Sequence, residues 1–177
     1  MESRRTQMTR RLIKQAYIEL LQKKSVGQVT VKELCACADV NRSTFYDHYT
    51  DFNSILREIE ADFLDHMPFF KLAGTKSDLK AEVLSFVRYA KDNSAAFIIL
   101  IKNGILFDAI YQSALRANVK SGLFSDVANK KARFITGFTV YGTIELLTQW
   151  LTDNTAASEN EIAKMIIQLS RACYDSA

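Results

Sequence analysis

The apolar positions of this chain recur every three to four residues almost from end to end, which is the period of an amphipathic α-helix. One Pro and six Gly among 177 residues leave these periodic stretches largely uninterrupted. The sequence therefore predicts an all-α protein of about nine helices. The helices are expected at residues 1–24, 30–38, 42–49, 52–70, 77–93, 95–103, 106–120, 126–153 and 158–174.

Residues 30–49 predict two short helices separated by a tight turn. Thr30 and Glu33 have the spacing of a capping box at the start of the first helix, and Asn41 is a good N-cap for the second. Asp39 lies between them, and its short polar side chain tolerates the left-handed conformation that such a turn requires. The pattern is typical of a helix-turn-helix, in which the second helix enters the major groove of DNA.

The polar face of the second helix suits contact with DNA. Arg42 can form two hydrogen bonds to a guanine, and Ser43 and Thr44 are short donors beside it. Tyr46 and His48 can donate to phosphate oxygens and so fix the register on the duplex. Helix-turn-helix shapes also occur without DNA, so an ordinary pair of core helices with a solvated face stays open at this point.

Four short segments combine a recurrent spacing with recurrent residue types: Thr-Val-Lys-Glu-Leu at 30–34, Val-Asn-Arg-Ser-Thr-Phe-Tyr at 40–46, His-Tyr at 48–49 and Ile-Leu at 55–56. Together they resemble the signature of TetR-family transcriptional regulators, over roughly residues 8–57. The resemblance implies a DNA-binding regulator, most often a repressor. Asp39 stands where the family usually has Gly, and Phe52 where it usually has a Lys that contacts phosphate. Loss of that contact is expected to weaken DNA affinity and to flatten its salt dependence.

The charge distribution agrees with a DNA-binding N-terminal part. Residues 1–50 hold nine Lys and Arg against five Asp and Glu, whereas residues 51–177 hold fourteen against fifteen. Basic residues crowd the first helix, and beside a helix-turn-helix they are expected to touch phosphates or a minor groove; a solvated helix start is the alternative. This cluster comprises Arg4, Arg5, Arg10, Arg11 and Lys14. The residues that we expect at the DNA are Thr30, Arg42, Ser43, Thr44, Tyr46, His48, Arg4 and Arg5.

We expect two domains: a helix-turn-helix domain at 1–50, and a helical ligand-sensing and dimerisation domain at 51–177 that begins with a connecting helix at about 52–70. Pro68 should kink or end that helix. Residues 134–151 contain one charged residue, Glu145, but several Thr and Gly residues make the stretch a poor membrane span. A helix that is apolar on most sides is buried in the folded protein. We expect this stretch to be buried against a second copy of the chain, in a homodimer formed through the last two helices. The expected interface residues are Gly137, Ile144, Thr148, Leu151 and Ile166.

Aromatic residues of the second part are candidates for a cavity that binds a neutral or weakly polar effector. They are Phe63, Phe86, Tyr89, Phe107, Tyr111, Phe138 and Tyr141. For each one, a plain core position is the alternative, because aromatics at helical spacing usually pack in cores.

The sequence gives no sign of catalysis or of a cofactor. It contains no nucleophile–base pair and no phosphate-binding loop, and Asp62 with His66 lacks a third metal ligand. Cys37 is the one thiol that could sense oxidants, although no basic neighbour is present to lower its pKa. The absence of an apolar leader and the three cysteines favour a cytoplasmic setting. We therefore expect a ligand-responsive repressor that binds a palindromic operator as a homodimer. The alternative is a regulator or interaction module, an activator included, that is controlled by a partner protein instead of a small ligand.

Overall fold

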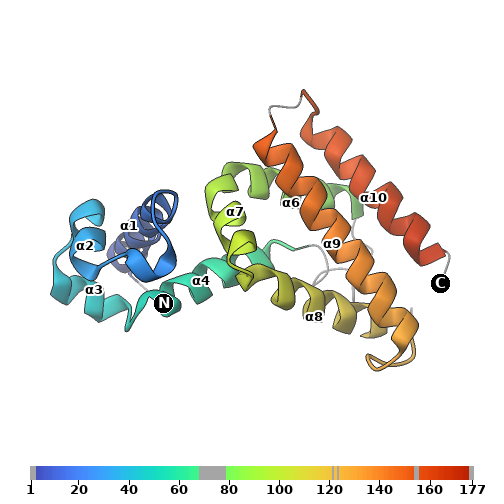
Figure 1. Cartoon of the computed structure of the whole chain (residues 1–177), viewed down its shortest axis with the longest axis horizontal. Helices are drawn as coiled ribbons and strands as arrows, with labels where there is room; N and C mark the ends of the chain where they lie inside the picture. The colour runs from blue at the N-terminus through green and yellow to red at the C-terminus, as the bar shows by residue number, and fades with distance from the viewer. Residues whose placement is uncertain (1–2, 68–78, 121, 123, 154–155, 176–177) are drawn as a thin grey trace. The chain divides into compact units, whose positions relative to one another are not determined.

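The computed structural model describes residues 3–67, 79–120, 122, 124–153 and 156–175. In these residues the chain forms nine α-helices and one 3₁₀-helix, and no strand, which confirms the all-α prediction (Figure 1). The elements are α1 (Arg4–Leu21), η1 (Val26–Gln28), α2 (Val31–Ala38), α3 (Arg42–His48), α4 (Phe52–Asp65), α6 (Leu79–Asp92), α7 (Ser94–Lys102), α8 (Ile105–Lys120), α9 (Lys130–Thr152) and α10 (Glu159–Asp175).

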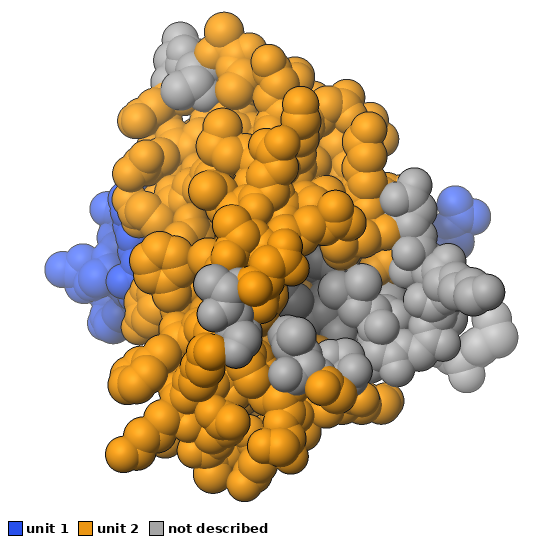
Figure 2. Space-filling view, turned by 90° about the vertical axis from the view of Figure 1, so that its right-hand side faces the viewer, with its two compact units in different colours: residues 1–61, 95–103 blue, residues 62–94, 104–177 orange. Residues whose placement is uncertain are grey.

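The chain divides into two compact units, which Figure 2 colours separately. Unit 1 comprises residues 1–61 and 95–103, and unit 2 comprises residues 62–94 and 104–177. The boundary falls inside α4, so this helix contributes to both units.

Unit 1 is built on a small core under the first three helices. Helix α1 packs against α2, and α2 packs against α3. Ile13, Leu34, Phe45 and Ile55 are completely buried. Each such side chain contributes about 1.5–3 kcal/mol of hydrophobic free energy, so the core holds these short helices together although they would be unstable in isolation.

Unit 2 is a bundle in which α10 packs against α6 and α9, and α9 also packs against α8 (Figure 1). The amide of Asn118 on α8 donates at 2.9 Å to both Thr136 on α9 and the hydroxyl of Tyr174 on α10. Lys91 of α6 pairs with Glu159 of α10. These polar contacts fix the register of helices whose apolar faces alone would allow sliding.

Local capping explains where two helices of unit 2 begin. Helix α9 starts at Lys130, not at 126 as expected, because Asn129 accepts hydrogen bonds from the backbone N–H groups of Lys131 and Ala132. A capping box precedes α10, since Ser158 donates from its backbone and its hydroxyl to Glu161 at 2.8 Å. The predicted effect of Pro68 on the connecting helix lies outside the described residues.

No single helix of the described residues is both long and apolar enough to cross a membrane. Among the described helices, α7 and α8 reach the length and composition of a membrane span only when they are counted together, and a bend of 90° separates them.

Candidate nucleic-acid interface

The turn between α2 and α3 has the geometry that its sequence predicts. Asp39 adopts the left-handed conformation, with φ 53° and ψ 46°, and the backbone N–H of Val40 donates to the carbonyl of Cys35 at 3.0 Å. Asn41 then caps α3, because its side-chain oxygen accepts from the backbone N–H of Thr44 at 2.7 Å. These local bonds end one helix and begin the next within three residues.

The start of α2 is also fixed by a capping box. Glu33 accepts from the backbone and the hydroxyl of Thr30, and the hydroxyl of Thr30 accepts from the backbone of Glu33. Lys24 forms an ion pair with the same carboxylate. The hydrogen bonds from Lys24 and Thr30 lower the pKa of Glu33 to about 2. Thr30 is exposed, but its hydroxyl is engaged in the cap.

Helix α3 buries one face and exposes the other. Phe45 and Tyr49 are buried, whereas Arg42 and Ser43 are exposed and the side chain of Tyr46 is 59% exposed. Arg42 forms no ion pair with any described residue. The ring of Tyr46 packs edge-to-face on the buried Phe45, with 5.1 Å between the centroids, and exposes its other side. The exposed face therefore offers a guanidinium and a phenol next to each other at the start and middle of α3.

The smaller polar residues of α3 are less available than the sequence suggests. The hydroxyl of Ser43 donates to the side chain of Asn41 at 2.7 Å, so it can only accept from a further partner. Thr44 and His48 are half-buried. Among the residues expected at the DNA, Arg42 and Tyr46 are thus the most accessible ones on α3.

Arg4 and Arg5 are exposed in the first turn of α1, directly after the N-cap Ser3. The helix dipole places positive charge at this end, so two cations there are unfavourable until an anion neutralises them. A phosphate group would supply that anion.

Two members of the basic cluster of α1 do not match the expectation of phosphate contact, because both bind Glu58 of α4. Arg10 donates to this carboxylate from Nε at 3.0 Å, and Lys14 lies 3.0 Å from its second oxygen. The hydroxyl of Tyr49, which follows α3, donates to it at 2.8 Å. Burial tends to raise the pKa of Glu58, but the three donors together hold it below the ordinary value of 4.5.

Sequence reasoning missed Glu58 and Lys32. Nothing local in the sequence connects Glu58 with donors up to 48 residues away. Lys32 is exposed in the first turn of α2, inside the segment that carried the family resemblance, and is a further candidate for phosphate contact.

The aromatic residues expected around a cavity fall into separate groups. Phe63 and Phe86 are buried, and the ring of Tyr89 lies 5.1 Å from that of Phe63 in an edge-to-face arrangement. Phe107 contacts Tyr141 at 3.6 Å between ring centroids and lies 6.4 Å from Tyr111.

Two of the expected cavity residues lie on the surface of unit 2. Phe138 is 72% exposed and Tyr141 is 60% exposed, so within one chain neither is enclosed. Tyr141 still contacts Phe107 of α8 with one side of its ring, so its exposure is partial.

The residues expected at a dimer interface are buried or half-buried within unit 2. Ile144 and Ile166 are buried inside unit 2, so they belong to its own core. A Cβ at Gly137 would lie 3.7 Å from the ring of Tyr111, which directs this position toward α8. Thr148 and Leu151 are half-buried.

Five large apolar residues of the last two helices are exposed, and we call this set the apolar face: Phe134, Phe138 and Tyr141 of α9, and Met165 and Leu169 of α10. Phe134 is 75% exposed. Large apolar side chains gathered on neighbouring helices are uncommon on a monomer and usually mark a contact with another molecule.

The candidate thiol and histidine sites show ordinary structural roles. Desolvation of the thiol and the nearby Glu19 carboxylate raise the pKa of Cys37, which lowers its reactivity. His66 lies 2.6 Å from the carbonyl of Asp62 and stacks on Tyr89. In the described residues, no group of three potential metal ligands comes together.

The helix-turn-helix of unit 1 and the helical bundle of unit 2 define an all-α protein of the helix-turn-helix class. A TetR-family profile, described as the transcriptional regulator C-terminal region, matches residues 78–172, more than half of the chain. The chain therefore belongs to the TetR family of transcriptional regulators.

Solved structures share the fold over nearly the whole chain. A TetR transcriptional regulator from Streptococcus agalactiae 2603V is 21% identical, with 94% of this chain and 96% of that chain covered and a TM-score of 0.65. A TetR-family regulator from Streptomyces coelicolor is 16% identical, with 93% and 81% covered and a TM-score of 0.63. The dihydroxyacetone kinase operon activator DhaS is 16% identical, with 95% and 97% covered and a TM-score of 0.61. A search of curated protein sequences gave no match.

Proposed function

We propose that this chain is a sequence-specific DNA-binding regulator that acts as a cytoplasmic homodimer on a palindromic operator. Residues 1–50 form the DNA-binding domain, and the remainder dimerises and receives the regulatory signal. The observation that carries the proposal is the exposed pair Arg42 and Tyr46 on a capped second helix of a helix-turn-helix. In this class of protein, such residues meet base edges and phosphates.

The apolar face supports the dimer. Its five side chains lie on the last two described helices, α9 and α10, where the expected dimer contact lies. A two-fold dimer would set the two recognition helices about 34–36 Å apart, or a multiple of this, to fit successive major grooves.

The proposal is tested by Arg42→Ala and Tyr46→Ala, with Arg88→Ala as a matched control on the exposed side of α6. Loss of a two-bond contact to a base should weaken operator binding by about tenfold or more. Fluorescence anisotropy on the bound operator and on a scrambled duplex measures both affinity and selectivity. Wild-type selectivity in both α3 variants would show that α3 does not read the operator.

The sign of regulation is proposed to be repression, relieved when a small effector binds unit 2 and favours a spacing of the DNA-binding domains that no longer fits the operator. DhaS, whose name describes an operon activator, has a similar fold, so activation is the second candidate. Control by a partner protein is the corresponding alternative to a small effector. A reporter fused to the bound promoter separates them. Deletion of the regulator raises expression under repression and lowers it under activation.

A further inference from the structure

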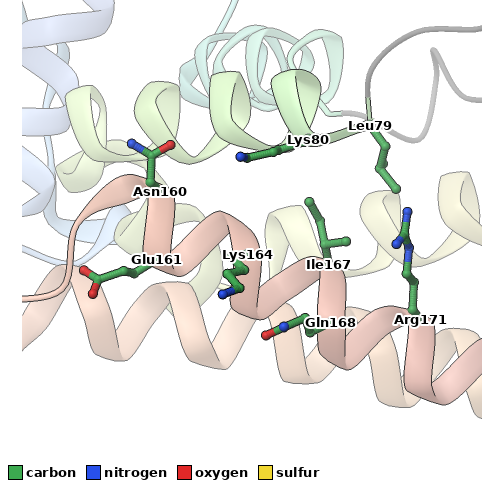
Figure 3. A pocket seen from close by; sticks show the side chains of 8 residues that line it. All are labelled: Leu79, Lys80, Asn160, Glu161, Lys164, Ile167, Gln168 and Arg171. Atoms are coloured by element: carbon green, nitrogen blue, oxygen red, sulfur yellow. The ribbon is translucent and has the colours of Figure 1, made fainter.

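A groove of about 780 Å³ lies between the first turn of α6 and one face of α10, entirely within unit 2 (Figure 3). We call it the α6–α10 groove. Its lining from α10 comes from positions 160, 161, 164, 167, 168 and 171, which recur at helical spacing and therefore form one stripe. It is separate from the helix-turn-helix and from the aromatic groups described above.

Positive charge is concentrated in this groove. Lys80 of α6 and Lys164 and Arg171 of α10 line it, against one carboxylate, Glu161. Unit 2 as a whole is neutral, with twelve Lys and Arg and twelve Asp and Glu. Three of its twelve basic residues thus surround one groove, although nothing in the composition of the unit requires it.

The two positive charges of α10 in the groove form no ion pair with the described residues. Lys164 and Arg171 are exposed, and neither forms an ion pair with a described carboxylate. Glu161 is engaged by the backbone and hydroxyl of Ser158 in the helix cap. Lys164 and Arg171 are two helical turns apart, about 10.5 Å along the axis, so one small molecule can reach both.

The groove also has uncharged lining of two kinds. Leu79 and Ile167 supply apolar surface, and Figure 3 shows Ile167 and Arg171 extending from α10 toward α6 while Leu79 extends toward Arg171. Asn160 and Gln168 supply amides that both donate and accept hydrogen bonds. The groove thus offers cations, amides and a small apolar surface, which together suit a small organic ligand that carries a negative charge.

From this lining we propose that the α6–α10 groove binds a small amphipathic organic anion, with an oxyanion group held by Lys164 and Arg171 and an apolar body against Leu79 and Ile167. Arg171 suits a carboxylate or a phosphate because its planar guanidinium can donate two parallel hydrogen bonds. The inference concerns binding by unit 2 alone, and it holds whether or not the chain binds DNA.

The test is a titration of the full-length ¹⁵N-labelled protein, followed by backbone amide resonances, with four probes: hexyl phosphate, hexanoate, 1-hexanol and inorganic phosphate. We expect hexyl phosphate, hexanoate or both to shift the resonances of residues 79–80 and 160–171 at lower concentrations than 1-hexanol or inorganic phosphate does. Stronger binding of hexyl phosphate than of hexanoate assigns the ligand to organic phosphates, and the reverse assigns it to carboxylic acids.

A pair of double variants separates the groove from general surface charge. Lys164→Gln with Arg171→Gln removes two charges inside the groove, whereas Arg116→Gln with Lys120→Gln removes the same two residue types from exposed positions of α8. The groove variant should weaken anion binding by about tenfold, because charged hydrogen bonds are lost, and the α8 variant should bind like wild type. Equal binding by the two variants, shifts confined to other helices, or no binding of either anion would overturn the proposal.

Discussion

At the scale of single residues, Tyr17 and Tyr49 are both buried in unit 1, but their hydroxyl groups differ in hydrogen bonding. The hydroxyl of Tyr49 donates to Glu58, whereas the hydroxyl of Tyr17 is buried without a hydrogen-bond partner among the described residues. Burial raises the pKa of Tyr17 to about 12. A buried polar group without a partner lowers stability, because it loses its hydrogen bond to water on folding and forms no other.

Tyr17→Phe should therefore increase the free energy of unfolding by about 1 kcal/mol. Tyr49→Phe is the control, and it should decrease that free energy by about 1.5–3 kcal/mol, because the lost bond is to a charged acceptor. Urea denaturation followed by circular dichroism measures both. A destabilised Tyr17→Phe variant would mean that this hydroxyl supports the fold.

Phe52 shows what the departure from the family pattern does for the fold. Its ring stacks on that of Tyr17, with 5.1 Å between the centroids and 15° between the planes, and lies 6.3 Å from that of Phe45. The side chain that replaces an expected phosphate contact thus closes an aromatic cluster at the start of α4.

Phe52→Lys should lower the free energy of unfolding by about 1 kcal/mol, through loss of the ring stacking. It should also steepen the dependence of log affinity on log salt by about 0.9, if one more phosphate is neutralised. Phe52→Gln, which loses the stacking without adding charge, is the control for DNA-binding measurements at several salt concentrations. Equal slopes for Lys and Gln would show that position 52 does not reach the backbone of DNA.

At the scale of elements, Glu58 ties α1, the end of α3 and α4 together through Arg10, Lys14 and Tyr49. Its pKa is lower in the folded protein than the ordinary 4.5. The ionised form therefore stabilises the fold above pH 4.5, and this contribution is lost as the pH falls through the lowered pKa.

Glu58→Gln should reduce stability at pH 7 and flatten the decline of stability in acid. Urea denaturation at steps between pH 7 and about pH 3 gives both curves. Parallel curves for the variant and the wild type would show that the ion cluster contributes nothing to acid sensitivity.

The elements also show what the sequence could predict. The caps of Thr30 and Asn41 and the left-handed Asp39 were predictable, because each depends on bonds between residues at most three or four apart. The partners of Glu58 were not, because they come together only when α1 and α4 pack. In α1, Met8 and Leu12 are 50% and 41% exposed although they lie on a periodic apolar stripe. The apolar residues of that helix form two overlapping stripes, and the sequence does not show which of the two faces the core.

The same limit applies to the expected effector and dimer residues. Apolarity placed Ile144 and Ile166 on a helix face but could not distinguish a core within one chain from a contact between two. Phe138 and Tyr141 were expected inside for the same reason. Which side of α9 meets α8 and α10 is decided by the packing of the whole bundle.

At the scale of the whole molecule, the apolar face should hold the dimer together. Phe138→Lys places a charge at a position that is 72% exposed in one chain, so the chain should fold normally but sediment as a monomer. Operator binding should then weaken, because the two chains no longer bind the two half-sites of the operator as one unit. Gln112→Lys on the exposed side of α8 adds the same charge elsewhere and should remain dimeric. A dimeric Phe138→Lys protein would place the interface on another surface.

The central claim is that this TetR-family chain binds DNA by sequence. It is tested most directly by binding to a library of genomic fragments, including the region upstream of its own gene, at two salt concentrations. We predict enrichment of fragments that share one palindromic sequence, with an affinity that falls steeply as salt rises. Weak binding without enrichment of any sequence would contradict the claim and favour a helical module that acts through a partner protein.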